Sequence, residues 1–155
     1  MTPAIQAAKK AKIWFFVRQY DHDPNTGSYG QEAVEKLGLD PQRVFKTLIV
    51  DTDTAGLCVA IVPVPNQIDF KAFARAVGSK KTQMAEARDA ERSTGYILGG
   101  ISPLGQKKHL PTVMDISAMT HETIFISAGR RGLDMEIAPA DLAALTRAVL
   151  ADIGK

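Results

Sequence analysis

The chain has 155 residues, of which 45% are hydrophobic and 23% are charged, a composition typical of one folded domain and not of a disordered or fibrous chain. Its formal net charge of +2 is far below that of proteins that coat nucleic acid nonspecifically, so any polyanion site must be local. No stretch reaches the roughly 20 apolar residues of a membrane-spanning helix, and a single cysteine excludes an internal disulfide. We therefore expect one cytoplasmic domain over residues 1–155.

The first predicted elements are a short helix, a strand and a second helix. A threonine followed by a proline favours the start of a helix over residues 2–10. An aromatic and β-branched run at 13–20 alternates in polarity and predicts a strand. Ser28 then has the spacing to Gln31 of a capping box, and Gly38 is expected to end the helix that follows.

The middle of the chain contains the strongest β patterns. These lie at 44–50 and 57–64, and the polar turn between them predicts an antiparallel hairpin. An amphipathic helix is expected at 69–78 and another short helix at 84–92. From 95 to 111 glycine, proline and serine recur without periodicity, which predicts a loop.

The last third returns to strands and ends in a helix. Strands are expected at 112–116, 123–127 and 133–137, before an amphipathic helix that opens at Pro139 and continues through Leu150. Helices and strands mixed in this way, with hairpins in place of regular βαβ units, favour an α/β domain with a mixed sheet that is either open or closed.

Several common catalytic chemistries find no support. The three histidines lie far apart, without the neighbouring His or Cys of a metal site, so no metal and no cofactor are expected. Cys58 lies inside an apolar run and is interpreted as a buried small residue and not as a nucleophile. The segment 99–108 lacks the lysine and hydroxyl positions of a P-loop, and no serine-hydrolase G-x-S-x-G motif occurs.

Three segments remain as candidate sites, each with a structural alternative. The glycines of 99–105 would let backbone N–H groups approach a ligand and stabilise an oxyanion, or would simply form a tight turn. Lys46 lies in an apolar strand; it points to solvent by alternation, or inward, where it is costly unless paired or used. The segment 127–134 joins two strands through glycines, as an ordinary turn also would.

Basic residues are clustered despite the small net charge. Solvated helix faces and turns explain each cluster singly, whereas several clusters converging on one rim would suit phosphate contacts. The clusters are Lys9, Lys10 and Lys12; Lys71, Arg75, Lys80 and Lys81; Lys107 and Lys108; and Arg130 and Arg131.

Five segments carry a resemblance to a known family. They are MTPA at 1–4, YDHDP at 20–24, FKTLIV at 45–50, RSTGYILGGISPLGQKKHLP at 92–111 and SAGRRGLDMEI at 127–137. Together they resemble the YbaK/EbsC family of bacterial Cys-tRNA(Pro) deacylases, related to the editing insertion domain of bacterial prolyl-tRNA synthetases. The resemblance spans essentially the whole chain, with similar spacing between the segments.

The resemblance implies a fold and a set of site residues. The fold would be a mixed, barrel-like β-sheet surrounded by helices. Lys46 would bind near the tRNA 3′ end and Gly99 would place backbone N–H groups at the scissile ester carbonyl. These two are the candidate catalytic residues. The candidate substrate-binding residues are Tyr20, Thr47, Tyr96, Gly100, Ser102, Ser127 and Asp134.

The family's chemistry also implies why no nucleophile stands out. The thiol of the mischarged cysteine would attack its own ester carbonyl and release a thiolactone and free tRNA, an intramolecular reaction in which positioning is worth roughly 7–11 kcal/mol. The expected partners are mischarged tRNA and, transiently, prolyl-tRNA synthetase, and the expected state is a monomer. An alanyl-tRNA(Pro) hydrolase that uses bound water, and a noncatalytic tRNA-binding or synthetase accessory module, remain as alternatives.

Overall fold

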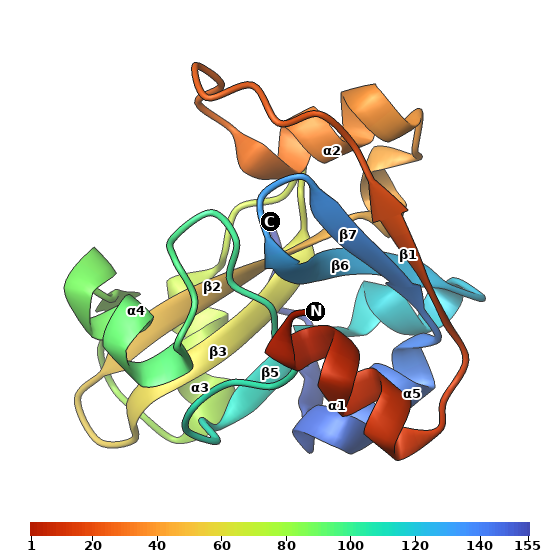
Figure 1. Ribbon diagram of the computed structural model, residues 1–155. Helices are drawn as coiled ribbons and strands as arrows, with labels where there is room; N and C mark the ends of the chain where they lie inside the picture. The colour runs from red at the N-terminus through yellow and green to blue at the C-terminus, as the bar shows by residue number, and fades with distance from the viewer.

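The computed structural model describes the backbone of residues 1–155 and every side chain except that of Tyr29. Its strands form two sheets around which the helices pack (Figure 1). The larger sheet has the order β4 (Thr82–Met84), β2 (Phe45–Thr52), β3 (Gly56–Pro63), β5 (Thr112–Asp115) and β8 (Val149–Ala151). The smaller, antiparallel sheet has the order β1 (Phe15–Gln19), β7 (Leu133–Ile137) and β6 (Ile124–Arg130).

Three helices, α1 (Pro3–Ala11), α2 (Tyr29–Leu37) and α3 (Phe70–Val77), begin and end close to the positions predicted from capping residues. The Thr2 hydroxyl accepts the N–H of Ile5, and the Asp69 carboxylate accepts the N–H of Ala72, as N-cap residues do. Ser28 makes no such side-chain bond, so the capping box expected there is not formed. The helices are α1 (Pro3–Ala11), α2 (Tyr29–Leu37), α3 (Phe70–Val77), α4 (Ala87–Thr94) and α5 (Pro139–Thr146), with 3-10 turns η1 (Pro41–Arg43) and η2 (Ile116–Thr120).

The sheet topology confirms the mixed α/β class. β2 and β3 form the predicted hairpin, whereas β5 lies parallel to β3 and to β8. The expected closure is not found: both strand orders are open, and an isolated parallel bridge between Val44 and Phe125 joins the two sheets. The strands described thus form two open sheets and not a closed barrel.

Strand alternation gives the larger sheet two apolar faces. Ile49 belongs to the core between the two sheets, while its neighbour Val50 packs into the core under α3. Cys58 is fully buried in this second core, as expected, and burial raises the pKa of its thiol. Each fully buried aliphatic side chain contributes about 1.5–3 kcal/mol relative to exposure, so β2 is fixed from both sides.

Two predicted helices have different bounds because sheet pairing overrides local pattern. Met84 ends β4, which pairs with the end of β2, and α4 starts only at Ala87. The last helix stops at Thr146, and Val149 and Leu150 form β8 beside β5 instead of continuing it. None of the helices described is both long and apolar enough to cross a membrane.

Candidate active site

A pocket of about 270 Å³ opens where four segments meet. They are β2, the start of α2, the β6–β7 turn and the loop around residues 99–105, called the glycine loop below. Six of the nine predicted site residues line it: Tyr20, Lys46, Thr47, Gly99, Ser127 and Asp134. The other lining residues are Ser28, Gly30, Ala33, Val44, Phe45, Leu48, Leu98, Ile101, Arg130 and Arg131. Segments far apart in the sequence are therefore brought together around one cavity.

Three predicted residues lie outside this lining. The Tyr96 hydroxyl donates to the Leu104 carbonyl over 2.6 Å, and the fully buried Ser102 hydroxyl accepts the Leu104 N–H over 3.2 Å. Gly100 packs so closely on the β6–β7 turn that a Cβ there would lie 3.2 Å from the Cα of Arg130. In this structure the three residues shape the glycine loop, and their contact with substrate stays a prediction.

The sequence left two orientations open for Lys46, toward solvent or inward, and the structure shows the inward one. Its side chain is half-buried, and Nζ donates to the Val64 carbonyl over 3.3 Å. Burial lowers the pKa of its ammonium group, and the ion pairs found between described side chains do not include it. Beside it, the Thr47 Oγ1 atom is buried and makes no hydrogen bond to any described residue. Both groups are available to a ligand.

Asp134 is the one carboxylic acid among the described lining residues. It pairs in register with Ser127 on one side and Arg18 on the other, and only 7% of it is exposed. Burial raises the pKa of Asp134 to about 7, so it changes from a hydrogen-bond donor to a charged acceptor near neutrality. Burial, followed by the charge of Asp134, raises the pKa of Tyr20 to about 12 and keeps that phenol neutral.

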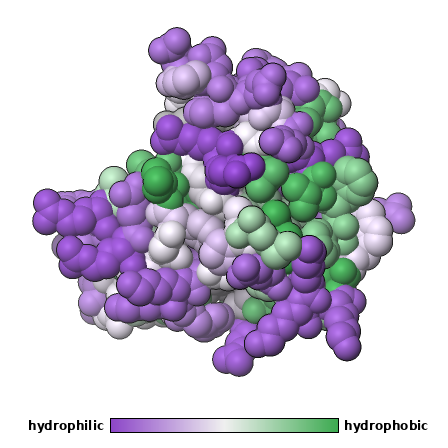
Figure 2. Space-filling model, viewed as in Figure 1, coloured by the Kyte–Doolittle hydropathy of each residue, from purple (hydrophilic) through white to green (hydrophobic). Residues whose placement is uncertain are grey.

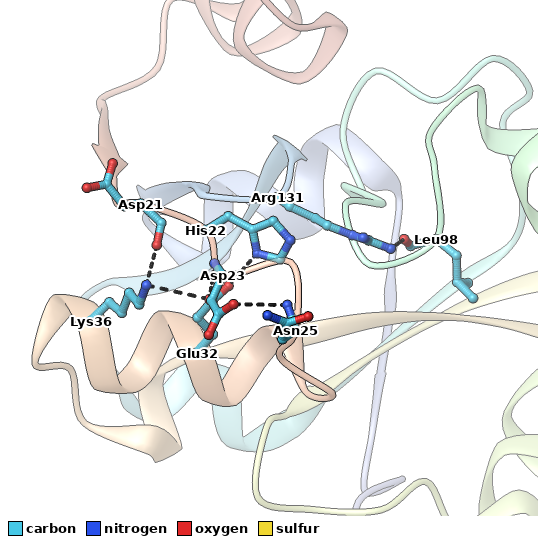
Figure 3. A network of polar contacts seen from close by, with 8 residues as sticks. All are labelled: Asp21, His22, Asp23, Asn25, Glu32, Lys36, Leu98 and Arg131. Atoms are coloured by element: carbon cyan, nitrogen blue, oxygen red, sulfur yellow. Dashed lines mark hydrogen bonds and ion pairs between the residues drawn. The ribbon is translucent and has the colours of Figure 1, made fainter.

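The glycine loop is anchored from two sides. The Leu98 N–H donates to the Glu91 carboxylate over 2.8 Å. The Leu98 carbonyl accepts from the Arg131 guanidinium over 2.7 Å (Figure 3). Gly99 has a φ of +90°, a backbone conformation that residues with a Cβ atom rarely adopt. The loop thus presents main chain without a side chain at the pocket wall.

A β-bulge shapes the opposite wall. Ser127 pairs with Asp134, but the next pair is Arg130 with Leu133, so the register shifts between them. Within the shift, Gly129 has a φ of +104° and donates its N–H to the Ser127 hydroxyl over 3.1 Å. A bulge re-aims the side chains that follow it, and here both arginines of the turn line the pocket.

A buried carboxylate holds α2, which forms a third wall of the pocket, against the loop that follows β1. Glu32 is 4% exposed and accepts from His22 Nδ1 and from the Asp23 N–H, each over 2.7 Å (Figure 3). Lys36 lies 3.8 Å from the same carboxylate and also donates to the Asp21 carbonyl. Burial alone would raise the pKa of Glu32, but the bonds from His22 and Asp23 and the charges of His22 and Lys36 lower it overall.

The contribution of α2 was absent from the sequence prediction. Gly30 and Ala33 line the pocket, and a Cβ on Gly30 would lie 2.6 Å from Val64 Cγ2, beside the carbonyl that holds Lys46. A glycine inside a predicted helix costs stability relative to alanine, and that local cost was the available signal of a close approach. The basic pair Arg130–Arg131 belonged to the candidate segment 127–134 and to one of the charge clusters, but neither arginine was itself predicted as a site residue.

Comparison with known proteins identifies the family of this chain. Residues 23–145 match the family model described as "Aminoacyl-tRNA editing domain". The chain belongs to this family. It is 36% identical over 153 residues to the Enterococcus faecalis (strain ATCC 700802 / V583) protein named "Putative Cys-tRNA(Pro)/Cys-tRNA(Cys) deacylase EbsC", covering 98% of this chain and 92% of that protein.

Solved structures share the fold of this editing-domain protein. One, described as "Crystal structure of a putative trans-editing enzyme for prolyl tRNA synthetase", has a TM-score of 0.86 at 22% identity and covers 100% of this chain and 99% of its own. The crystal structure of hypothetical protein APE2540 has a TM-score of 0.87 at 21% identity, over 99% and 100% of the two chains. At such identities the likeness concerns the fold.

Proposed function

We propose that this protein is a trans-editing aminoacyl-tRNA deacylase that removes cysteine from mischarged Cys-tRNA(Pro). Membership of the editing-domain family and the similarity to the E. faecalis protein support the activity and the substrate class. The observation that carries the chemistry is the composition of the pocket. It joins an ammonium, a buried carboxyl group and glycine main chain, while its described lining contains neither histidine nor cysteine.

Such a pocket suits a reaction in which the substrate supplies its own nucleophile. The cysteine sulfur attacks the ester carbonyl carbon, a C–S bond forms and the thiol proton is lost to water. The C–O bond to the ribose then breaks, and the departing oxygen takes a proton from water, leaving a thiolactone and free tRNA. Holding sulfur and carbon in attack geometry supplies roughly 7–11 kcal/mol in favourable cases.

Each wall of the pocket has a role in this proposal. The Lys46 ammonium pairs with a phosphate of the tRNA 3′ end, and the main chain at Gly99 donates to the developing oxyanion, where one donor is worth about 2.7–4 kcal/mol. Charged Asp134 accepts from the α-ammonium group of the amino acid. The Thr47 hydroxyl, which makes no hydrogen bond to any described residue, gains a hydrogen-bond partner from the substrate.

We further propose a cytoplasmic monomer that meets prolyl-tRNA synthetase only transiently. A net charge of +2 is small for a protein that must hold tRNA alone, because phosphate contacts provide much of the affinity for nucleic acid. Proofreading also answers a physical limit, since a synthetase pocket discriminates weakly between side chains of similar size.

The test is deacylation of Cys-, Ala-, Ser- and 2-aminobutyryl-tRNA(Pro) by wild type, Lys46→Ala and the exposed control Lys10→Ala. The 2-aminobutyryl ester matches cysteine in shape but lacks sulfur. We expect rapid loss of the cysteinyl ester only, and a loss of one to two orders of magnitude in kcat/KM for Lys46→Ala, from the roughly 1.5–3 kcal/mol of a charged hydrogen bond.

Three outcomes would contradict the proposal in different ways. Loss of the alanyl and 2-aminobutyryl esters at the cysteinyl rate would indicate attack by water and not by the substrate thiol. Persistence of all esters at their spontaneous rates, with tRNA still bound, would indicate a noncatalytic binding module. An unchanged rate for Lys46→Ala would remove that ammonium from the site.

A further inference from the structure

A second pocket, of about 520 Å³, opens at the other end of β2. It lies between the β2–β3 turn, the first turn of α3 and β4, and its lining includes three lysines from two separate segments. Lys71 comes from α3, while Lys80 and Lys81 precede β4. Part of the basic cluster noted in the sequence therefore converges on one cavity. The remaining lining residues are Asp51, Thr52, Asp53, Phe70, Thr82 and Gln83.

The main chain of this pocket is fixed while its ammonium groups are not. One oxygen of Asp53 accepts the N–H groups of Lys80 and Lys81 over 3.1 and 3.3 Å, and the Asp53 N–H donates to the Lys81 carbonyl over 3.2 Å. All three lysines are exposed, and they take part in none of the ion pairs between described side chains.

Two carboxylates oppose the three lysines in this cavity. Asp53 is directed at the backbone N–H groups that lower its pKa, so its role within the pocket is to hold the lysine-bearing turn. Asp51 is exposed and lies in β2. The cavity therefore keeps a net positive lining, suited to an anion with separated charges and not to one compact dianion.

We call this second pocket, lined by Lys71, Lys80 and Lys81, the lysine pocket. Its distance from the candidate active site indicates which ligand it could bind. Phe45 to Leu48 line the active site and Asp51 to Asp53 line the lysine pocket, so β2 connects the two (Figure 1). From Lys46 to Thr52 a strand rising about 3.3 Å per residue spans roughly 20 Å. A nucleic-acid strand advancing about 3.4 Å per nucleotide covers this in roughly six nucleotides.

We propose that the lysine pocket binds the phosphate backbone of the tRNA acceptor helix while the aminoacylated 3′ end occupies the active site. The identity of the ligand rests on the proposed function, because a tRNA held by its 3′ end extends past its single-stranded terminus over this distance. The contact carries no base recognition: it adds affinity for any tRNA and makes binding dependent on salt.

The test compares Lys80→Ala/Lys81→Ala with the control Lys9→Ala/Lys10→Ala, whose lysines are also adjacent and exposed. Two substrates are used, Cys-tRNA(Pro) and the cysteinyl ester of the trinucleotide CCA, which is too short to reach the lysine pocket. We expect the first variant to raise KM for the tRNA roughly three- to tenfold. It should also reduce the slope of log KM against log salt by about one per lysine, with wild-type kinetics on the short ester.

Other results would overturn the inference. An unchanged KM and salt slope on the tRNA, or an equal loss on the short ester, would exclude a backbone contact. A loss that requires added prolyl-tRNA synthetase would make the pocket a protein-docking surface. If wild type cleaves neither ester, the proposed function fails, but anisotropy titration of labelled uncharged tRNA(Pro) still shows whether the two lysines bind RNA.

Discussion

Replacing Asp134 by asparagine is expected to change how stability depends on pH. Burial raises the pKa of this carboxyl group from an ordinary value of 3.8 to about 7. The folded state therefore binds a proton that the unfolded state releases between these values, so folding stability falls as pH rises through that window. At 1.36 kcal/mol per unit, wild type should lose about 3 kcal/mol between pH 5 and pH 8 relative to Asp134→Asn.

Urea unfolding of both proteins at pH 5 and pH 8 measures this difference, provided that the slope m stays the same. The other ionisable groups are common to both proteins, so their contributions cancel in the comparison. Asp152→Asn removes an exposed carboxyl group and is the matched control. The difference in unfolding free energy between wild type and Asp134→Asn should change between the two pH values. If it stays the same to within about 1 kcal/mol, the buried-acid argument is refuted.

Three further predictions concern the glycine loop and α2, which support the pocket. Gly105→Ala should lower stability by about 2 kcal/mol or more, because φ is +68° and the new Cβ would lie 2.5 Å from a backbone oxygen of α1; Gly27→Ala, with open space around it, should be near neutral in the same thermal melts. Glu32→Gln should cost about 1.5–3 kcal/mol near neutral pH. That contribution is present above pH 4.5 and lost as pH falls through the lowered folded pKa, so the two urea curves should converge in acid. Arg131→Ala should speed hydrogen exchange at Leu98 and lower kcat/KM for the cysteinyl ester roughly tenfold, since it frees the carbonyl that anchors the loop; protection equal to wild type would contradict this.

Local signals predicted most of the elements because the interactions that define them are local. The Thr2 and Asp69 caps lie within three residues of the N–H groups they accept, and the β2–β3 hairpin is closed by a short turn. β8 could not be found in this way. Its pairing partner is β5, more than thirty residues away, and Val149 and Leu150 also fit a helical pattern.

Local sequence patterns predicted the candidate site only in its parts, and the family resemblance alone implied their assembly. Lys46 stood out as a charge in an apolar strand, yet alternation alone favoured solvent, and the ammonium group instead donates to the Val64 carbonyl in the turn after β3. The network of Glu32 with His22 joins segments whose pairing has no local periodicity. Only the fold shows that α2 closes the pocket.

The exposed surface also follows from the fold more than from composition. Apolar side chains gather over the region of the smaller sheet on one face, whereas the surface around α4 is hydrophilic (Figure 2). Trp14 and Phe16 are 56% and 54% exposed, and the Arg18 guanidinium lies 5.2 Å from the ring centre of Phe16. Sequence hydropathy identified these aromatic residues only as part of a strand.

The bulge between Ser127 and Arg130 limits how this domain can vary. In a strand pair, changing the length of one partner by one residue turns every later side chain to the opposite face. Deleting Ala128 or Gly129 would thus exchange the pocket face for the core face along the rest of the turn. Substitution at Ser127 or Asp134 leaves the length of both strands unchanged. If the pocket holds the amino acid as proposed, such substitutions should alter selectivity, whereas insertions and deletions in the β6–β7 turn should abolish the site.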